Sequence, residues 1–353
     1  MGKKKQQYDG GHYSRRGYSK EDLCKGPEPQ GYAGLDRHAL YESAVQSPKG
    51  DISYLLCFYQ RYIGQQVPEH LREDFCGTAL LASTWCRGDL ARRTGMGLDI
   101  DRDALMWGMQ HNGEGLADTA QPCLWLLHGD VTQPLDKAVL VNCPVRSNSN
   151  GSQPSVEQSM QDMSIHASDI ICAFNFSVCL LHQRSEVQAY FRQSRQALSK
   201  RGGILVMDLL GGHAAEESVF MHRHNDTTGA RFVWEQEGYN PVTRHIHCYI
   251  TLRDPDTQKN LRRAFHYHWR LWTIPELHDM LMGAGFSRVN VWLRPMQGVS
   301  SGCEDEEGEE GSSDSGEHDE DFEEYSAKTF SPKTAELLSK GWTAFVIGVA
   351  EPQ

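Results

Sequence analysis

The chain has 353 residues, of which 39% are hydrophobic and 23% charged. This composition is typical of a globular protein with one sizeable core or two small ones, and no apolar run is long enough to span a membrane. The net charge is −12, but residues 304–324 hold 13 of the 47 acidic residues and no Lys or Arg. The remaining 34 acidic residues nearly balance the 35 basic ones, so overall charge gives no argument for a phosphate-binding surface.

The cysteines predict a reducing environment. None of the ten forms a Cys-x-x-Cys pair, and several lie in apolar segments, as buried free thiols do. The first residues lack the apolar stretch of a secretion signal and do not resemble an amphipathic transit helix. We therefore predict a cytoplasmic protein, with a nuclear address formed by Lys3, Lys4 and Lys5 as the alternative.

Changes in composition indicate the domain organisation. We expect residues 1–45, which begin with a basic tail, to be disordered or loosely packed. Residues 46–353 are expected to form one domain, because core elements continue after each interruption. The interruptions are a polar insertion at 142–166, a β-rich cover at 231–272 and an acidic, disordered loop at 299–327.

Hydrophobic periodicity predicts alternating helices and strands in the first part of this domain. The segment VPEHLRED, residues 67–74, stands where a first strand is needed, but it is too charged for a typical buried strand. The expected elements are helix 49–65, helix 78–87, strand 95–100, helix 102–112, strand 123–128, strand 169–175, helix 184–200 and strand 203–209.

The later elements complete the predicted fold. Three segments with period-two alternation lie within the cover, and helix 274–284 and strands 287–293 and 341–351 follow. The order of elements predicts an α/β fold with a doubly wound, mostly parallel seven-stranded sheet. We expect one antiparallel edge strand in that sheet and a small, separate antiparallel β insertion.

A glycine turn and a distant carboxylate form the most informative pattern. The turn lies in REDFCGTALLA, residues 72–82, and Asp99 follows Gly77 by 22 residues at the end of a second apolar segment. In doubly wound sheets, a glycine turn lets backbone approach a nucleotide-like ligand, and the later acid accepts hydrogen bonds from ribose hydroxyls. The spacing therefore predicts a cofactor site at the crevice of the sheet.

The chain resembles the class I S-adenosylmethionine-dependent methyltransferases over about residues 49–351. REDFCGT resembles the turn of an uncharacterised subgroup, with Phe75 and Ala79 at two of the three glycine positions of the family's D-x-G-x-G-x-G string. GLDID matches the second strand, HGDV the third and FNF, residues 174–176, the fourth. The resemblance implies S-adenosyl-L-methionine as cofactor, bound by Glu73, Cys76, Gly77, Thr78, Asp99, Ile100, Asp130, Val131 and Asn175.

Some of these residues also have simpler interpretations. Asp101 is a favoured N-cap for helix 102–112, and we prefer that role for it. Asp99 could also help to cap helix 102–112, and Asp130 could be an ordinary turn residue. Asn175 could close a loop, although substrates bind where strands end at the switch point of a sheet.

Methyl transfer requires few special side chains, because the methyl group on the sulfonium of S-adenosylmethionine is already activated for transfer. The enzyme must mainly hold an acceptor atom in line, about 3–3.5 Å from the methyl group. We predict catalytic roles for Asn175, Asp208 and His182, the last two as bases for an acceptor proton. The cover is rich in aromatic residues, and the residues expected to bind the acceptor are Phe176, Trp234, Tyr267 and Arg270.

Four histidines raise the alternative of a metal site. His245 and His247 share one face of an expected strand, and His266 and His268 share a face of another. No carboxylate or cysteine pattern completes a ligand set, so we predict no metal. We expect a polar outer face instead, with Ile246, Cys248, Ile250, Phe265, Tyr267 and Trp269 packing inward.

These patterns predict methyl transfer to an unidentified small-molecule or protein acceptor, with small molecules favoured and nucleic acid and membranes disfavoured. A catalytically silent cofactor-binding module is one alternative, because Phe75 could mark a decayed turn. An NAD-dependent oxidoreductase is the other, although no G-x-G-x-x-G string follows the first strand. The sequence does not indicate the oligomeric state.

Overall fold

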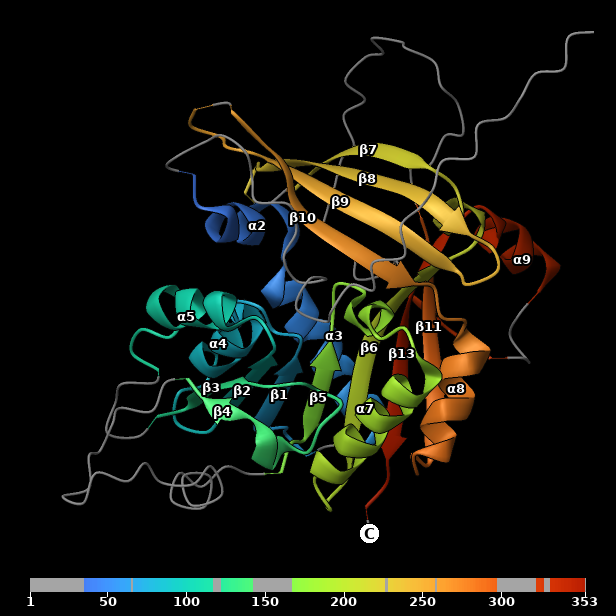
Figure 1. Cartoon of the computed structure of the whole chain (residues 1–353). Coiled ribbons are helices and arrows are strands. Elements are labelled where there is room, and N and C mark those ends of the chain that lie inside the picture. Colours follow the sequence, from blue (N-terminus) through green and yellow to red (C-terminus); the bar gives the residue numbers. More distant parts are fainter. Residues whose placement is uncertain are drawn as a thin grey trace, which may run out of the picture.

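The computed structural model describes residues 35–64, 66–116, 122–141, 167–225, 228–257, 259–296, 322–326 and 331–352. They form a nine-stranded sheet flanked by helices and a separate four-stranded sheet (Figure 1). The described helices are α2 (Arg37–Val45), α3 (Pro48–Tyr62), α4 (Leu80–Arg87), α5 (Arg102–His111), α7 (Arg184–Ala197), α8 (Ile274–Gly283) and α9 (Pro332–Ser339), with short 3-10 turns η1 (Leu135–Lys137), η2 (Ser177–Leu180) and η3 (His213–Ala215).

The nine-stranded sheet has the order β12-β11-β13-β6-β5-β1-β2-β3-β4. Its five neighbouring strands β6, β5, β1, β2 and β3 are parallel, as expected for a doubly wound sheet. The strands are β1 (His70–Asp74), β2 (Thr94–Asp99), β3 (Leu124–His128), β4 (Val139–Leu140), β5 (Ile170–Ala173), β6 (Gly203–Gly211), β11 (Arg288–Pro295), β12 (Glu323–Tyr325) and β13 (Trp342–Ala350).

The sheet differs from the prediction in strand number and edges. Seven strands were expected, and the short strands β4 and β12 add one at each edge. The late strand β13 is antiparallel, as predicted, but it lies inside the sheet between β6 and β11. Its run from Ala344 to Ala350 is buried throughout, which suits an interior strand better than an edge strand.

Alternating residues of β6 explain why helices cover both faces of the sheet. Ile204 and Val206 pack in one core cluster with residues of α3 and α4. Leu205 and Met207 pack in a second cluster with residues of α7 and α8. Successive side chains of a strand point to opposite faces, so this continuous apolar run buries area on both sides.

The first strand is more charged than a buried parallel strand usually is, and the structure explains how it is accommodated. The Arg72 Nε donates to the Asp74 Oδ1 at 2.6 Å, and both side chains are almost fully buried on the same face of β1. On the other face, Glu73 accepts a hydrogen bond from the backbone N–H of Ala82 in α4. The expectation that residues 67–74 suit a buried strand poorly was therefore wrong for His70–Asp74, because these charges are compensated locally.

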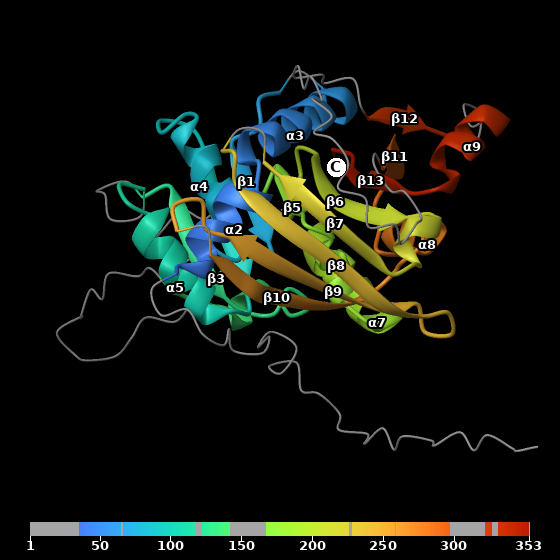
Figure 2. The same cartoon turned by 90° about the horizontal axis from the view of Figure 1, so that it is seen from above.

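The second sheet forms a cover over the carboxyl ends of the parallel strands (Figures 1 and 2). Three strands were expected within residues 231–272, and the structure adds a fourth before them. Its order is β10-β9-β8-β7, and all neighbours are antiparallel. The strands are β7 (Val219–His224), β8 (Arg231–Asn240), β9 (His245–Arg253) and β10 (Asn260–Arg270).

Helix α2 lies between the cover and the large sheet, beneath one end of β8, β9 and β10 (Figure 2). Asp36 caps it by accepting hydrogen bonds from the N–H groups of His38 and Ala39. Ala44 packs in a cluster with Ile250 of the cover. This part of the N-terminal segment was expected to be loosely packed, and it forms a docked helix instead.

The expected insertions are only partly within the described residues. The polar insertion at 142–166 lies outside them, as does most of the acidic loop at 299–327. The end of that loop forms β12, which pairs with β11, and Phe322 is buried. Glu324 accepts a hydrogen bond from the Tyr62 hydroxyl at 2.6 Å and pairs with Arg61, so this end of the loop is docked on the sheet.

Candidate functional site

The turn after β1 has the backbone that the glycine pattern predicts. Phe75, Gly77 and Ala79 all have positive φ values, of 55°, 53° and 55°. These are the three positions at which the resemblance expects glycine, and the left-handed conformation is the reason that glycine is favoured there. Phe75 and Ala79 therefore keep the turn geometry at a conformational cost of order 1–3 kcal/mol each.

Asp99 connects this turn to the end of β2. Its Oδ2 accepts a hydrogen bond from the Gly77 N–H at 2.7 Å, and its Oδ1 accepts one from the Asp101 N–H at 2.7 Å. Burial raises the pKa of Asp99 to about 6. Asp101 itself caps α5 by accepting from the N–H groups of Asp103 and Ala104, as predicted.

Glu73 and Cys76 lie beneath the turn. Burial raises the pKa of Glu73 to about 8, although its hydrogen bond from Ala82 works in the opposite direction. The Cys76 thiol is buried, and burial raises its pKa well above the ordinary value. A Cβ atom at Gly97 of β2 would lie 2.8 Å from the Cys76 Sγ, so β2 and the turn approach each other closely. Cys76 therefore fills space under the turn.

The residues predicted after β3 shape the neighbouring loop. The Asp130 Oδ1 accepts hydrogen bonds from both the N–H and the hydroxyl of Thr132, at 2.9 and 2.7 Å. Val131 is buried, and Ile100 is 40% exposed with its carbonyl oxygen 3.1 Å from the His128 ring nitrogen. Asp130 thus closes a turn at the same edge of the sheet as Asp99, which fits the simpler interpretation of this residue.

The backbone is also left-handed at two non-glycine residues after the end of β5. Asn175 and Phe176 have φ values of 59° and 58°. The Phe176 N–H donates to the Asp208 Oδ1 at 2.7 Å. Burial raises the pKa of Asp208 to about 8. Two of the three predicted catalytic residues are therefore close together: Asn175 follows β5, which borders β1 at the switch point, and Asp208 lies on the neighbouring strand β6.

Several carboxyl groups approach one another on the α3 and α4 side of this crevice. Asp51, near the start of α3, raises the pKa values of both Glu73 and Asp208. Burial raises the pKa of Asp51 itself to about 7. Burial raises the pKa of Cys172 in β5 well above its ordinary value, and the neighbouring acids, Glu73 first among them, raise it further. Acids in such mutual repulsion favour a cationic ligand.

Helix α2 contributes two residues that the sequence did not single out. The Glu42 carboxylate accepts hydrogen bonds from the Thr78 hydroxyl and, at 2.7 Å, from the Asn112 side chain. Burial raises its pKa. Tyr41 packs against Phe265 of the cover, with ring centroids 4.7 Å apart. The helix-capping residue Asp36 before an apolar segment was the signal that could have identified this helix.

The aromatic residues predicted to bind the acceptor meet at one side chain. Trp269 of β10 has its ring centroid 5.6 Å from Phe176, 5.5 Å from Trp234 and 5.3 Å from Tyr267. Trp269 is buried, whereas the three surrounding residues are partly buried. The cover and the end of β5 are therefore joined by an aromatic cluster with Trp269 at its centre.

Two predicted residues lie elsewhere. The His182 ring is in contact with His245 and His268, at centroid distances of 4.7 Å. The Arg270 guanidinium donates to the His182 carbonyl at 3.0 Å, lies 3.5 Å from Glu276 and stacks over Trp272. These contacts hold the end of β10 to the segment after η2 and occupy the guanidinium that was expected to bind the acceptor.

The histidines lie on the outer face of the cover, as predicted. The rings of His247 and His268 stack at 4.5 Å, and His247 also contacts His266. Burial lowers the pKa of His245 to about 4 and that of His268 to about 3, with further lowering from neighbouring imidazoles. No group of three or more metal-binding side chains occurs among the described residues.

Comparisons with known proteins found similar solved structures but no related sequences. No family model and no curated protein matches the chain. The model is similar to an S-adenosylmethionine-dependent methyltransferase from Clostridium acetobutylicum, with a TM-score of 0.48, 13% identity, and 87% and 96% of the two chains covered. It is also similar to DesVI of Streptomyces venezuelae, with a TM-score of 0.47, 14% identity and coverages of 73% and 93%.

A further similar structure is CalS10 of Micromonospora echinaspora, an amino pentose methyltransferase solved with S-adenosylmethionine bound. The TM-score is 0.47, the identity is 11%, and the similarity covers 90% of this chain and 98% of that one. In the part of this chain that the model describes, no helix is long and apolar enough to cross a membrane.

Proposed function

We propose that the chain is an S-adenosyl-L-methionine-dependent methyltransferase that acts on a small-molecule acceptor. The proposal rests above all on the turn at residues 75–79, which is left-handed at every second residue and is held to Asp99 through the N–H of Gly77. This arrangement lies at the carboxyl ends of parallel strands, where doubly wound sheets bind nucleotide-like ligands.

The crevice also suits the chemistry of this cofactor. Each oxygen of Asp99 accepts one backbone hydrogen bond from Gly77 or Asp101, and a carboxylate has about four acceptor sites, so ribose hydroxyls can still bind. The neighbouring acids Glu73 and Asp208 have raised pKa values because they are buried. A ligand with cationic groups would stabilise their ionised forms.

The bound cofactor would supply an activated methyl group on a cationic sulfur. The task of the chain is then to hold the acceptor atom in line and to exclude water. We assign Asn175 and Asp208 to the acceptor side, since Asn175 follows β5 at the switch point and Asp208 holds the N–H of the next residue, Phe176. Burial raises the pKa of Asp208 to about 8, so the ligand-free chain holds this carboxyl largely protonated near neutral pH. A cationic ligand beside it would favour the carboxylate, which could then take up a proton from the acceptor. His182 is a weaker candidate base, because its ring is among the outer-face histidines.

The cover would provide the acceptor site. Phe176, Trp234 and Tyr267 surround Trp269 above the end of β5, and we propose that they contact an apolar part of the acceptor. Such a site suits a small molecule, since it lies between two sheets rather than on an extended charged surface. We leave Arg270 out of this proposed site, because its guanidinium already contacts His182, Glu276 and Trp272.

Calorimetry with S-adenosylmethionine, S-adenosylhomocysteine and NAD tests the cofactor. Binding of the first two without NAD supports the proposal, and binding of NAD alone identifies an oxidoreductase instead. Incubation with methyl-labelled S-adenosylmethionine and fractionated cell extract then tests the reaction. Label in the small-molecule fraction is the expected result. Cofactor binding without transfer to any fraction would identify a silent binding module.

A further inference from the structure

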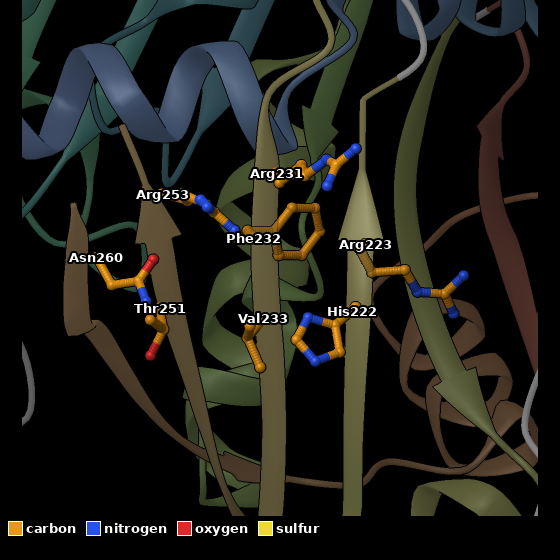
Figure 3. Close-up of a pocket in the computed structure, with 8 residues that line it drawn as sticks. All are labelled: His222, Arg223, Arg231, Phe232, Val233, Thr251, Arg253 and Asn260. Atoms are coloured by element: carbon orange, nitrogen blue, oxygen red, sulfur yellow. The ribbon is translucent and has the colours of Figure 1, made fainter. Parts of the chain in front are cut away.

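A pocket on the cover lies away from the crevice and is lined by residues of all four of its strands. Its volume is about 340 Å³, at the lower end of the range for small-molecule sites. Figure 3 shows these residues, which are His222 and Arg223 of β7, Arg231, Phe232 and Val233 of β8, Thr251 and Arg253 of β9, and Asn260 of β10.

All the ionisable side chains that line this pocket are basic. Three arginines and one histidine line it, and none of its lining residues is acidic. Within the described part of the chain, Arg231 and Arg253 have no carboxylate partner, unlike Arg263 nearby, which pairs with Glu235 at 2.8 Å. The carboxylate of the adjacent Asp254 is turned to its own loop, where it accepts hydrogen bonds from the Asp256 N–H and the Thr257 hydroxyl.

Arg231 and Arg253 stand directly opposite each other in the register of β8 and β9. Side chains at such positions have Cβ atoms about 4.5–5.5 Å apart, and like charges there destabilise a sheet. Both side chains are exposed. Figure 3 shows the Arg253 guanidinium extending from β9 toward β8, whereas that of Arg223 points away on the far side of β7. The Arg231 guanidinium extends from β8 toward β7, so the two arginines lie side by side at one end of the pocket with both groups directed the same way.

The remaining lining residues indicate which chemical groups a ligand would contact. Thr251 and Asn260 offer a hydroxyl and an amide, and Val233 offers apolar surface on the same face. Phe232 points to the inner face, where it packs with Leu252 and residues of α2. Guanidinium groups match phosphate oxygens in bidentate geometry, and Arg is favoured over Lys for that reason. A phosphate monoester with an aromatic or apolar body has both features that these walls complement.

We propose that this pocket is a binding site for a phosphate monoester, whose phosphate is held by Arg231 and Arg253 and whose organic part packs against Val233 on the outer face of the cover. The inference is independent of methyl transfer, because the pocket shares no residue with the crevice. The bound phosphate would also relieve the repulsion between the two arginines.

Calorimetry on the full chain with phenyl phosphate at pH 8, compared with phenol and with inorganic phosphate, tests the site. Phenyl phosphate should bind at least tenfold more tightly than either. R231Q/R253Q should lower that affinity at least tenfold, and R231K/R253K should lower it less, because charge is kept while the bidentate fork is lost. R92Q is the matched control, since Arg92 is an exposed arginine that pairs with Glu69 at the edge of the large sheet.

The melting temperature gives a readout that does not depend on a ligand. R231Q/R253Q should melt at the same temperature as the wild type or higher, because a like-charge pair is removed. A fall beyond that of R92Q would mean that the arginines stabilise the cover, and it would overturn the proposal. Phenyl phosphate affinity that is unchanged in R231Q/R253Q would also overturn it. Tighter binding of a polyglutamate peptide than of phenyl phosphate would identify an acidic-peptide surface instead.

Discussion

The carboxylate of Asp99 accepts a hydrogen bond from the backbone N–H of Gly77 at 2.7 Å, across 22 residues of sequence. One side chain therefore fixes both the end of β2 and the turn after β1. Since Gly77 is left-handed and its neighbours Phe75 and Ala79 are too, this contact helps to hold a backbone that is otherwise costly. Loss of Asp99 should affect the turn and the proposed ribose contact together.

Asp99→Ala should weaken S-adenosylhomocysteine binding by about 1.5–3 kcal/mol, or at least tenfold in dissociation constant, because charge-assisted hydrogen bonds are lost. Calorimetry measures this directly. Asp101→Ala is the control: it removes the N-cap of α5 and should cost about 1 kcal/mol of stability with little change in affinity. Unchanged affinity in a folded Asp99→Ala protein would refute the cofactor assignment.

Gly108→Ala should displace the turn from the side of α5. A Cβ atom at Gly108 would lie under 3.0 Å from backbone atoms of Thr78, which cannot move without shifting the turn. We expect a loss of about 2 kcal/mol or more in the free energy of unfolding and weaker S-adenosylhomocysteine binding.

Gly283→Ala is the matched control for this substitution. Gly283 ends α8, and a Cβ atom there would meet nothing within 4 Å. Denaturant unfolding should show it to be neutral or stabilising by up to about 1 kcal/mol. Similar losses in both variants would indicate a general helix effect rather than a contact with Thr78.

Stability without ligand should fall as the pH rises. Burial raises the pKa of Asp208 from its ordinary value of 3.8 to about 8 in the folded state, so folded chains bind a proton that unfolded chains release. Proton binding by Asp208 adds fully to the free energy of unfolding below about pH 4, and this addition is lost by pH 8. Between these values the free energy of unfolding falls by no more than about 1.4 kcal/mol per pH unit. Asp208→Asn should flatten the dependence of melting temperature on pH between 5 and 8. A profile that stays parallel to the wild type would contradict this.

Deletion of residues 304–319 should change the free energy of unfolding by less than about 0.5 kcal/mol, because the tract has no apolar surface to bury and loop length affects closure only weakly. The deletion stops before Phe322, whose ring lies 4.6 Å from Phe345 and under the Arg294 guanidinium. Phe322→Ala should cost about 3 kcal/mol in denaturant unfolding. If the deletion cost as much, the tract itself would be docked.

Trp234→Ala should lower methyl transfer on an identified acceptor at least tenfold while S-adenosylhomocysteine affinity stays within about twofold, because Trp234 contacts Trp269 of the cover rather than the glycine turn. Arg270→Ala should mainly lower the melting temperature, since its contacts are with His182, Glu276 and Trp272. Steady-state kinetics and thermal unfolding separate the two. Loss of cofactor binding in Trp234→Ala would remove it from the acceptor site.

Local patterns in the sequence were enough to predict most core elements in order and the location of the candidate cofactor site. Continuous apolar runs such as that of β6 specify parallel strands covered on both faces, and this depends only on local composition. The 22-residue spacing from Gly77 to Asp99 spans one helix and one strand, so the two residues had to meet at the same sheet edge.

Contacts between distant segments explain how the departures from these patterns are accommodated. Arg72 and Asp74 could be buried in β1 because they pair with each other on one face. Helix α2 docks through Glu42 and Tyr41, and β12 through Glu324, on partners far away in sequence. Such contacts become favourable only when distant segments are brought together and their charges and polar groups find partners there, which no local pattern encodes.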